Sequence, residues 1–255
     1  MSHIYNHKKD KFDSRDYKYS PFDKLTQLPP SVDLRPQCSP VRDQGNLGCC
    51  SGFALTAMRE FMEIKNKSLL ARVFKPTILS PLFVYYEERV IEGTVNSDSG
   101  AMLRDGMKVL ASLGACPEKD DPYVIHEFNL KPSAKTLQDA IKYEISQYQK
   151  LSTLQDVKTC LASGNGFVLG FEVYNSFENG EVESTGVMPV PIPGEPLLGG
   201  HAVFCCGYCD DSYYYGGGYL IIKNSWGKAW GPLGGYFYMP YNAFSSVTDM
   251  WTAIK

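Results

Sequence analysis

The pattern of apolar residues changes half-way along this chain, and this change restricts the fold more than any other feature of the sequence. In the first half, apolar side chains recur at helical spacing without internal proline, which predicts helices at about 50–65, 81–90 and 102–113. Past Pro122, short apolar runs bounded by turns predict strands at 167–174, 202–208, 219–223 and 236–239, with helices at about 133–143 and 154–163. Helices first and strands second predict an α+β protein whose two lobes meet along a cleft.

Length and charge limit the kind of partner that the chain can bind. Its 255 residues are enough for one large domain or for two lobes around a shared cleft. The net charge is −3, from 25 Lys and Arg against 28 Asp and Glu, so we expect neither a nucleic acid nor an anionic membrane as partner. Residues 1–30 lack the apolar core of a secretory signal, and no run approaches the ~18 apolar residues of a membrane span. The default expectation is therefore a cytoplasmic protein, although the sequence does not identify the compartment.

The first 28 or so residues are polar and rich in tyrosine, with charges of both signs interleaved. This composition is typical of an arm, and Pro29-Pro30 marks its end. An extended chain of that length reaches ~90 Å, which is ample to cross a cleft. We therefore predict that residues 1–28 pack on a folded body made by residues 29–255 and cover its active site. Within the body we expect a helical lobe at about 45–125 and a β lobe at about 126–245.

Eight cysteines, including the adjacent pairs Cys49-Cys50 and Cys205-Cys206, need an explanation. An even number suggests disulfides, but without a secretory signal such thiols are more often buried, metal-bound or catalytic. Cys205 and Cys206, with Cys209 and His201, suggest zinc, yet alternate residues of a strand point to opposite faces, so both members of the pair reach one metal only at a bulge. We therefore predict core thiols and no metal. The remaining histidines are predicted at the surface: His3, His7 and His126.

A cysteine and a histidine in two separate segments suit nucleophilic catalysis. Cys50 lies where a loop becomes a helix, and a helix N-terminus and a nearby imidazolium both lower the pKa of a thiol from its usual ~8.5. His201 follows two glycines and begins an apolar strand, so its ring can stand at the edge of the cleft. An imidazole there can form an ion pair with the Cys50 thiolate and later protonate a leaving amine.

Two further side chains complete this predicted site. Asn224 ends the strand that follows His201 and can hold the second ring nitrogen, which fixes the orientation of the imidazole. Gln44 lies six residues before Cys50, across a glycine-containing loop that can fold back on itself. Its side-chain amide and the Cys50 backbone N–H can stabilise the oxyanion that forms when a carbonyl is attacked.

These residues, in this order and at this spacing, resemble the papain-like cysteine proteases, in particular the bacterial-type branch with a short N-terminal arm. The resemblance covers nearly the whole chain and rests on Gln44 and Cys50, on Gly200-His201 about 150 residues downstream, and on Asn224-Ser225-Trp226-Gly227. It implies a two-lobed fold with a helical left lobe, an antiparallel β-barrel-like right lobe and the active site in the cleft between them. Residues 29–255 then form the peptidase domain, and residues 1–28 form an N-terminal arm or the short pro-region of a zymogen.

The resemblance also implies an activity. We expect a cysteine-type endopeptidase that works through a thiolate–imidazolium pair and an acyl-enzyme intermediate, as a monomer without a cofactor, on protein or peptide substrates. Gly100-Ala101 stands where the family has paired glycines that bind the substrate backbone. Gly200 and Ala202 flank the histidine, and Ala202 is a candidate wall of the main specificity pocket. Trp226 corresponds to the tryptophan that shields the hydrogen bond between asparagine and histidine.

Three departures from the family pattern lie near the predicted nucleophile. Leu47 replaces a cysteine, so the disulfide that the family forms there is absent. Ser51 replaces an aromatic residue, and Cys49 replaces a small one. Cys49 is a candidate redox partner of Cys50, although adjacent cysteines seldom pair because of ring strain. Cys49 and Ser51 together motivate an alternative function, a catalytically silent papain-like scaffold that binds peptides or serves a structural role.

Overall fold

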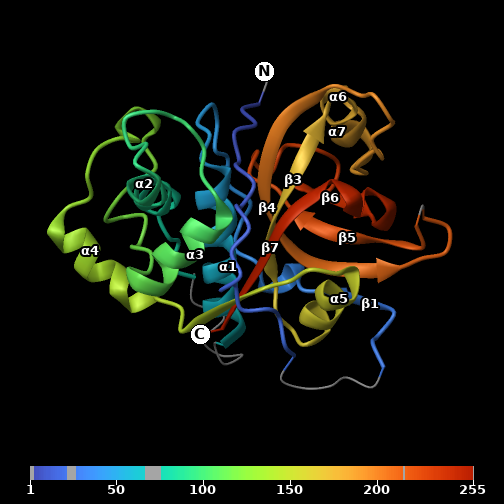
Figure 1. Ribbon diagram of the computed structural model, residues 1–255, viewed down its shortest axis with the longest axis horizontal. Helices are drawn as coiled ribbons and strands as arrows, with labels where there is room; N and C mark the ends of the chain where they lie inside the picture. Colours follow the sequence, from blue (N-terminus) through green and yellow to red (C-terminus); the bar gives the residue numbers. More distant parts are fainter. Residues whose placement is uncertain (1–2, 22–26, 67–75, 215, 255) are drawn as a thin grey trace.

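The computed structural model describes residues 3–21, 27–66, 76–214 and 216–254. Helices α2, α3 and α4 lie on one side and most strands on the other, with α1 between them (Figure 1). This arrangement confirms the predicted α+β class and the two-lobed form. Helices α1 to α7 span, in order, Cys50–Asn66, Pro81–Glu92, Leu103–Ser112, Ala134–Ala140, Leu154–Ala162, Asn175–Glu178 and Glu181–Thr185, and short 3₁₀ helices occupy Arg35–Gln37, Ile125–Glu127, Ile141–Tyr143 and Tyr241–Ser246.

The described strands form one antiparallel sheet in the order β2-β7-β3-β4-β5-β6, with β1 paired to β4. Strands β2 and β6 lie at the two ends of this path, so the sheet is open among the described residues and does not close into the predicted barrel-like lobe. The strands β1 to β7 span, in order, Ser31–Asp33, Gln147–Lys150, Phe167–Tyr174, Leu197–Asp210, Gly218–Lys223, Tyr236–Pro240 and Val247–Ile254.

The division of the body into lobes differs from the predicted ranges. Helix α4 lies beside α3 on the helical side, beyond the predicted boundary near 125 (Figure 1). Strand β7 extends the sheet past 245, where it pairs with β3 and β2. The sequence of β7 mixes apolar residues with Asp249 and Thr252, both of them buried, and so lacks the alternation by which a strand is recognised.

Local sequence explains where the helices at the lobe junction begin and end. Helix α1 is buried on nearly all sides of its first three turns, and it packs against β4 and α2. The Ser80 hydroxyl caps α2 by accepting a hydrogen bond from the Phe83 N–H at 3.0 Å, and Pro81 occupies the first helical position. Gly93 ends α2 with φ 71°, a left-handed conformation that favours glycine. These caps fix α2 against the outer face of α1.

The arm runs between the helical side and the sheet, as the blue trace of Figure 1 shows. Asp10 ties it to both sides, because one carboxylate oxygen accepts from the Arg104 backbone N–H at 3.1 Å and the other from Trp251 Nε1 at 2.7 Å. Asp16 adds an ion pair with the Arg104 guanidinium at 2.6 Å. His7 is buried, with Nε2 3.6 Å from Asp249, so the prediction that it lies at the surface was wrong. Burial of its ring follows from the path of the arm, which no local pattern reveals.

Candidate active site

Cys50 is the first residue of α1, and its side chain is buried at the junction with the sheet. Burial raises the pKa of the Cys50 thiol to about 12, although the backbone N–H of Ala202, and those of Ser51 and Cys50 itself, act in the opposite direction. Ala202 is the residue after His201 on β4, so the helix start and the histidine strand meet here. The structure thus brings together two residues that lie far apart in the sequence.

His201 lies on β4, paired with Phe171 of β3, and its ring is fully buried. Its Nε2 lies 2.8 Å from Asn224 Oδ1. The amide oxygen of Asn224 also accepts from the Ser225 N–H at 2.9 Å, which identifies it as the acceptor. The proton of a neutral imidazole therefore resides on Nε2, and Nδ1 carries a lone pair. No described residue forms a hydrogen bond with Nδ1.

Burial also lowers the pKa of His201 to about 3, against the opposing hydrogen bond with Asn224. Burial thus disfavours the charged form of both the Cys50 thiol and the His201 imidazole in this arrangement. Tyr5 of the arm lies edge-on to the His201 ring, with centroids 6.1 Å apart.

Gln44 lies at the start of the tight loop that leads into α1 and is buried. Its Nε2 donates to the Leu47 carbonyl at 3.0 Å, and its Oε1 accepts from the Ser225 hydroxyl at 2.5 Å. Gly45 has φ 57°, which lets the chain turn back toward the helix start. These contacts orient the amide and link the Gln44 loop to the segment that carries Asn224.

Trp226 follows Asn224 by two residues and stacks on the His201 ring, with centroids 4.9 Å apart and planes at 21°. The His3 ring of the arm stacks on Trp226 at 3.6 Å and also bonds Glu178 at 2.9 Å, so it is half-buried instead of lying free at the surface. His126 is largely exposed, as predicted. Trp226 therefore has the position that the resemblance implies, next to the bond between histidine and asparagine.

The arm contacts four of the residues predicted to bind substrate, namely Gly100, Ala101, Gly200 and Trp226. The His7 N–H donates to the Gly200 carbonyl at 3.1 Å, and the Lys8 N–H donates to the Ala101 carbonyl at 3.2 Å. Gly100 has φ 65°, and a Cβ there would lie 1.8 Å from the Asn6 carbonyl oxygen. The absence of a side chain at Gly100 thus allows an extended chain to approach closely.

One sequence comparison decides the family. The model of the papain family cysteine proteases matches residues 28–251. The chain belongs to this family. An uncharacterized peptidase C1-like protein of Acanthamoeba polyphaga mimivirus is 34% identical over 281 residues, which cover 98% of this chain and 86% of that protein. A cathepsin B-like protein of Giardia intestinalis is 29% identical over 233 residues, which cover 83% of this chain and 69% of that protein.

A solved structure agrees with this assignment. Xylellain, a cysteine protease from Xylella fastidiosa, superimposes with a TM-score of 0.88 at 39% identity, covering 98% of this chain and 96% of that one. These findings confirm that the chain is a papain-like cysteine peptidase, a hydrolase. In this papain-like arrangement, β4 carries His201, and the backbone of the next residue, Ala202, contacts Cys50 at the start of α1.

The two unusual neighbours of Cys50, the predicted nucleophile, face away from the sheet. The Cys49 thiol donates to the Pro81 carbonyl at 3.4 Å and packs with Leu82 and Tyr85 of α2. The Ser51 hydroxyl donates to Glu88 Oε2 at 2.6 Å. Sequence reasoning missed Glu88, because a glutamate in an otherwise amphipathic helix is usually exposed, whereas this one is fully buried.

Asp98 is a second residue that sequence reasoning missed. Its carboxylate accepts from the Gly48 N–H at 3.0 Å and from the Tyr85 hydroxyl at 2.5 Å, and its backbone carbonyl accepts from the arm residue Asn6 at 3.1 Å. It therefore joins the loop before the nucleophile to the arm. Its place near Gly100 in the sequence was the only available signal.

The described part of the chain contains no group of three or more His, Cys, Asp or Glu side chains placed to hold a metal ion. Within the same residues, no helix is long and apolar enough to cross a bilayer.

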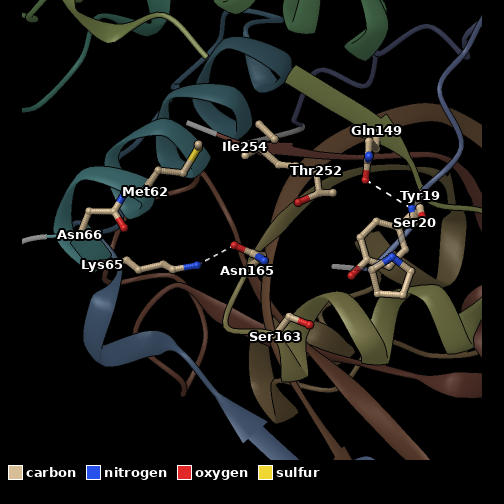
Figure 2. A pocket seen from close by; sticks show the side chains of 12 residues that line it. Tyr19, Ser20, Met62, Lys65, Asn66, Gln149, Ser163, Asn165, Thr252 and Ile254 are labelled. Atoms are coloured by element: carbon tan, nitrogen blue, oxygen red, sulfur yellow. Dashed lines mark hydrogen bonds between the residues drawn. The ribbon is translucent and has the colours of Figure 1, made fainter. Parts of the chain in front are cut away.

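A separate hollow of about 300 Å³ lies between the end of α1, the arm and β7, as Figure 2 shows. Across it, Lys65 Nζ donates to Asn165 Oδ1 at 2.6 Å, and the Ser20 N–H donates to Gln149 Oε1 at 3.4 Å. None of the predicted catalytic residues lines this hollow. The chemistry of the papain-like site therefore does not involve it.

Proposed function

We propose that this peptidase cleaves peptide bonds as an endopeptidase through an acyl-enzyme on Cys50, with His201 as base and acid. The observation that carries the proposal is the 2.8 Å contact between His201 Nε2 and Asn224 Oδ1. Because the oxygen of Asn224 must accept, Nδ1 is the basic nitrogen, and it has no partner of its own among the described residues. A proton acceptor is therefore held ready beside the helix start that carries the thiol.

The chemical steps follow from these positions. Nδ1 of His201 takes the proton of the Cys50 thiol, and the sulfur attacks the carbonyl carbon of the substrate. The oxyanion accepts hydrogen bonds from the Cys50 backbone N–H and from the second N–H of the Gln44 amide, whose first N–H is bound to Leu47. The C–N bond then breaks as Nδ1 returns its proton to the amine, and water releases the acid product by the reverse sequence of proton transfers.

The contacts of the arm support the proposal that this surface binds an extended substrate backbone. It forms backbone hydrogen bonds with Gly200 and Ala101 and passes directly over Gly100. A peptide has the same donors and acceptors, so we assign these three residues to substrate binding, with Ala202 beside the thiol and Trp226 beside His201. Substrate and arm would then compete for one surface.

Substitution of the nucleophile tests the chemistry. In a chain truncated before Pro29, Cys50→Ala should lower hydrolysis of dye-linked peptides by roughly a thousandfold or more, since no other group can form the acyl-enzyme. Cys49→Ala is the matched control, because the Cys49 thiol faces α2, and hydrolysis should stay within a few-fold of the parent chain. Loss of activity in Cys49→Ala, with activity retained in Cys50→Ala, would show that the nucleophile is misassigned.

The same contacts support a latent state. With the arm in place, Cys50 and His201 are both buried, which disfavours the charged form of each, and the aromatic ring of Tyr5 stands against His201. Departure of the arm would admit water and allow the proton to move from thiol to imidazole. Residues 1–28 would thus act as a pro-region that holds the peptidase inactive.

An arm variant tests latency without truncation. Tyr5→Ala in the full chain should raise peptide hydrolysis about tenfold, because a buried aromatic contact is lost and the covered state becomes less populated. Phe12→Ala serves as control, since Phe12 is 93% exposed on the same arm, and it should leave the rate unchanged. Equal rates for the two variants and the parent would make the arm a structural strap.

A further inference from the structure

Two cysteines outside the catalytic site lie against each other where β1 meets β4. Asp33 pairs with Gly207, and the next residue, Leu34, donates its N–H to the Cys206 carbonyl at 2.8 Å. The chain then turns through the 3₁₀ helix Arg35–Gln37, which brings the Cys38 thiol back to the Leu34 carbonyl at 3.6 Å. The Cys206 thiol donates to the Ile221 carbonyl at 3.6 Å, and the side chains of Cys38 and Cys206 interact closely enough for each to shift the pKa of the other. Both are free thiols in this structure.

A β-bulge explains how Cys206 reaches this position. The register between β4 and β5 shifts between Cys205 and Gly207, so Cys206 is the extra residue. Without the bulge, adjacent cysteines would point to opposite faces of the sheet. The sequence-based exclusion of a shared site for Cys205 and Cys206 rested on that alternation, and the bulge removes its premise. The new neighbour of Cys206 is nevertheless Cys38 and not a metal ligand set.

Polar groups surround this pair, and its two thiols differ in exposure and in the direction of their pKa shifts. Cys38 is partly exposed and also bonds the Tyr236 hydroxyl, and Lys223, whose Nζ donates to Ser39 at 3.0 Å, lies close by. The side-chain interaction with Cys206 lowers the pKa of Cys38, with Lys223 acting in the same direction against the cost of burial. Burial raises the pKa of Cys206, with the neighbouring Cys38 next in importance. Cys38 is thus the partly exposed thiol whose thiolate form is favoured, and Cys206 is the buried thiol whose protonated form is favoured.

We propose that Cys38 and Cys206 form a redox-active dithiol that closes to a disulfide when the protein meets hydrogen peroxide. The Cys38 thiolate attacks one peroxide oxygen, the O–O bond breaks, and the departing hydroxide takes up a proton as water, which leaves a sulfenic acid on Cys38. The Cys206 sulfur then attacks the Cys38 sulfur, the S–O bond breaks, and hydroxide leaves with the Cys206 proton as a second water. Two thiols lose two electrons, and one peroxide becomes two waters.

The location of the pair distinguishes it from the catalytic thiol. Cys50 is fully buried with a raised pKa, whereas Cys38 is partly exposed, so peroxide should reach Cys38 first in the full chain. Cys38 lies six residues before Gln44, and Cys206 lies five residues after His201 on β4, so a bridge here would tie together the two segments that carry these catalytic groups. The inference does not depend on the proposed mechanism, because it concerns thiols outside that site.

Peptide mapping of the oxidised full chain tests this proposal. After treatment with hydrogen peroxide, the remaining thiols are blocked with N-ethylmaleimide, and the protein is digested without reduction. We expect a peptide that joins Cys38 to Cys206, an intact mass lower by two hydrogen atoms before blocking, and reversal by dithiothreitol. Cys38→Ser should lose the bridge, and Cys206→Ser should leave a sulfenic acid on Cys38 that a dimedone probe captures. Cys209→Ser is the matched control, because Cys209 is also partly exposed on β4 and should leave the bridge intact.

Three results would overturn the proposal. A bridge between other cysteines would place the redox pair elsewhere. Oxidation of Cys38 to a sulfinic acid while Cys206 is recovered with its maleimide label would show that the two thiols do not react with each other. Recovery of all eight cysteines unmodified by peroxide would show that no redox-active pair exists. Each reading comes from the wild-type chain and so holds even if a serine variant does not fold.

Discussion

The two faces of the first turn of α1 use their polar side chains in opposite ways. Toward the sheet, the Cys50 thiol lies beside the backbone of Ala202, and His201 Nδ1 stays without a hydrogen-bond partner among the described residues. Toward α2, the Ser51 hydroxyl binds the buried carboxyl group of Glu88 at 2.6 Å. One face thus keeps a basic nitrogen available for a reaction, and the other clamps two helices together. Of two neighbouring residues on a helix, one can therefore serve a reaction while the other stabilises the fold.

Removal of the hydrogen bond between Ser51 and Glu88 should have the largest effect on the stability of the α2 side. Ser51→Ala takes away the hydrogen bond to Glu88 Oε2, and no described residue bonds Oε1 either, so a buried carboxyl group is left without partners. We expect the free energy of unfolding to fall by about 1–3 kcal/mol in urea titrations. Ser163→Ala, which removes an exposed hydroxyl at the end of α5, should stay within about 0.5 kcal/mol. Equal losses in the two variants would show that the clamp does not stabilise the fold.

The contribution of Glu88 to folding stability should depend on pH. Burial raises the pKa of Glu88 well above 4.5, Glu92 and Asp105 add to the rise, and Ser51 and Arg89 oppose it. A carboxyl group with a raised folded-state pKa binds its proton more tightly in the folded chain. Its contribution to stability is therefore complete below the unfolded-state pKa and is lost as the pH rises toward the folded-state value.

Glu88→Gln, which cannot ionise, should therefore gain stability relative to the wild type as the pH rises above about 4.5, by at most about 1.4 kcal/mol per pH unit. Urea titrations of both proteins over a series of pH values measure this difference. A difference that stays constant with pH would mean that Glu88 does not hold its proton in the folded state.

The sequence predicted those parts of the molecule that depend on local pattern. The helix at 50–65 and the strand at 167–174 follow from spacing of apolar residues, and the structure has them at Cys50–Asn66 and Phe167–Tyr174. Cys50, His201 and Asn224 were recognisable because the family keeps their spacing. Strand β7 was missed because Asp249 is buried under His7, a contact that depends on the arm and not on the alternation of residues within the strand.

The other features that the sequence did not predict share one cause. The burial of Glu88, the bulge at Cys206 and the course of the arm over Gly100 all depend on contacts between segments far apart in the sequence. Local pattern treats a glutamate as exposed and a strand as regular, since each is the common case. The open sheet likewise follows from long-range pairing, which places β2 and β6 at opposite ends.

In the proposed function, Cys50 is the nucleophile and the arm keeps it unreactive. Labelling with an epoxide thiol trap, followed by mass mapping, tests both parts in one measurement on the full chain and on a chain truncated before Pro29. We predict that the label resides on Cys50 and that truncation accelerates labelling at least about tenfold, since a buried neutral thiol becomes a thiolate paired with His201. Label on Cys49, or equal rates of Cys50 labelling in the two chains, would contradict this account.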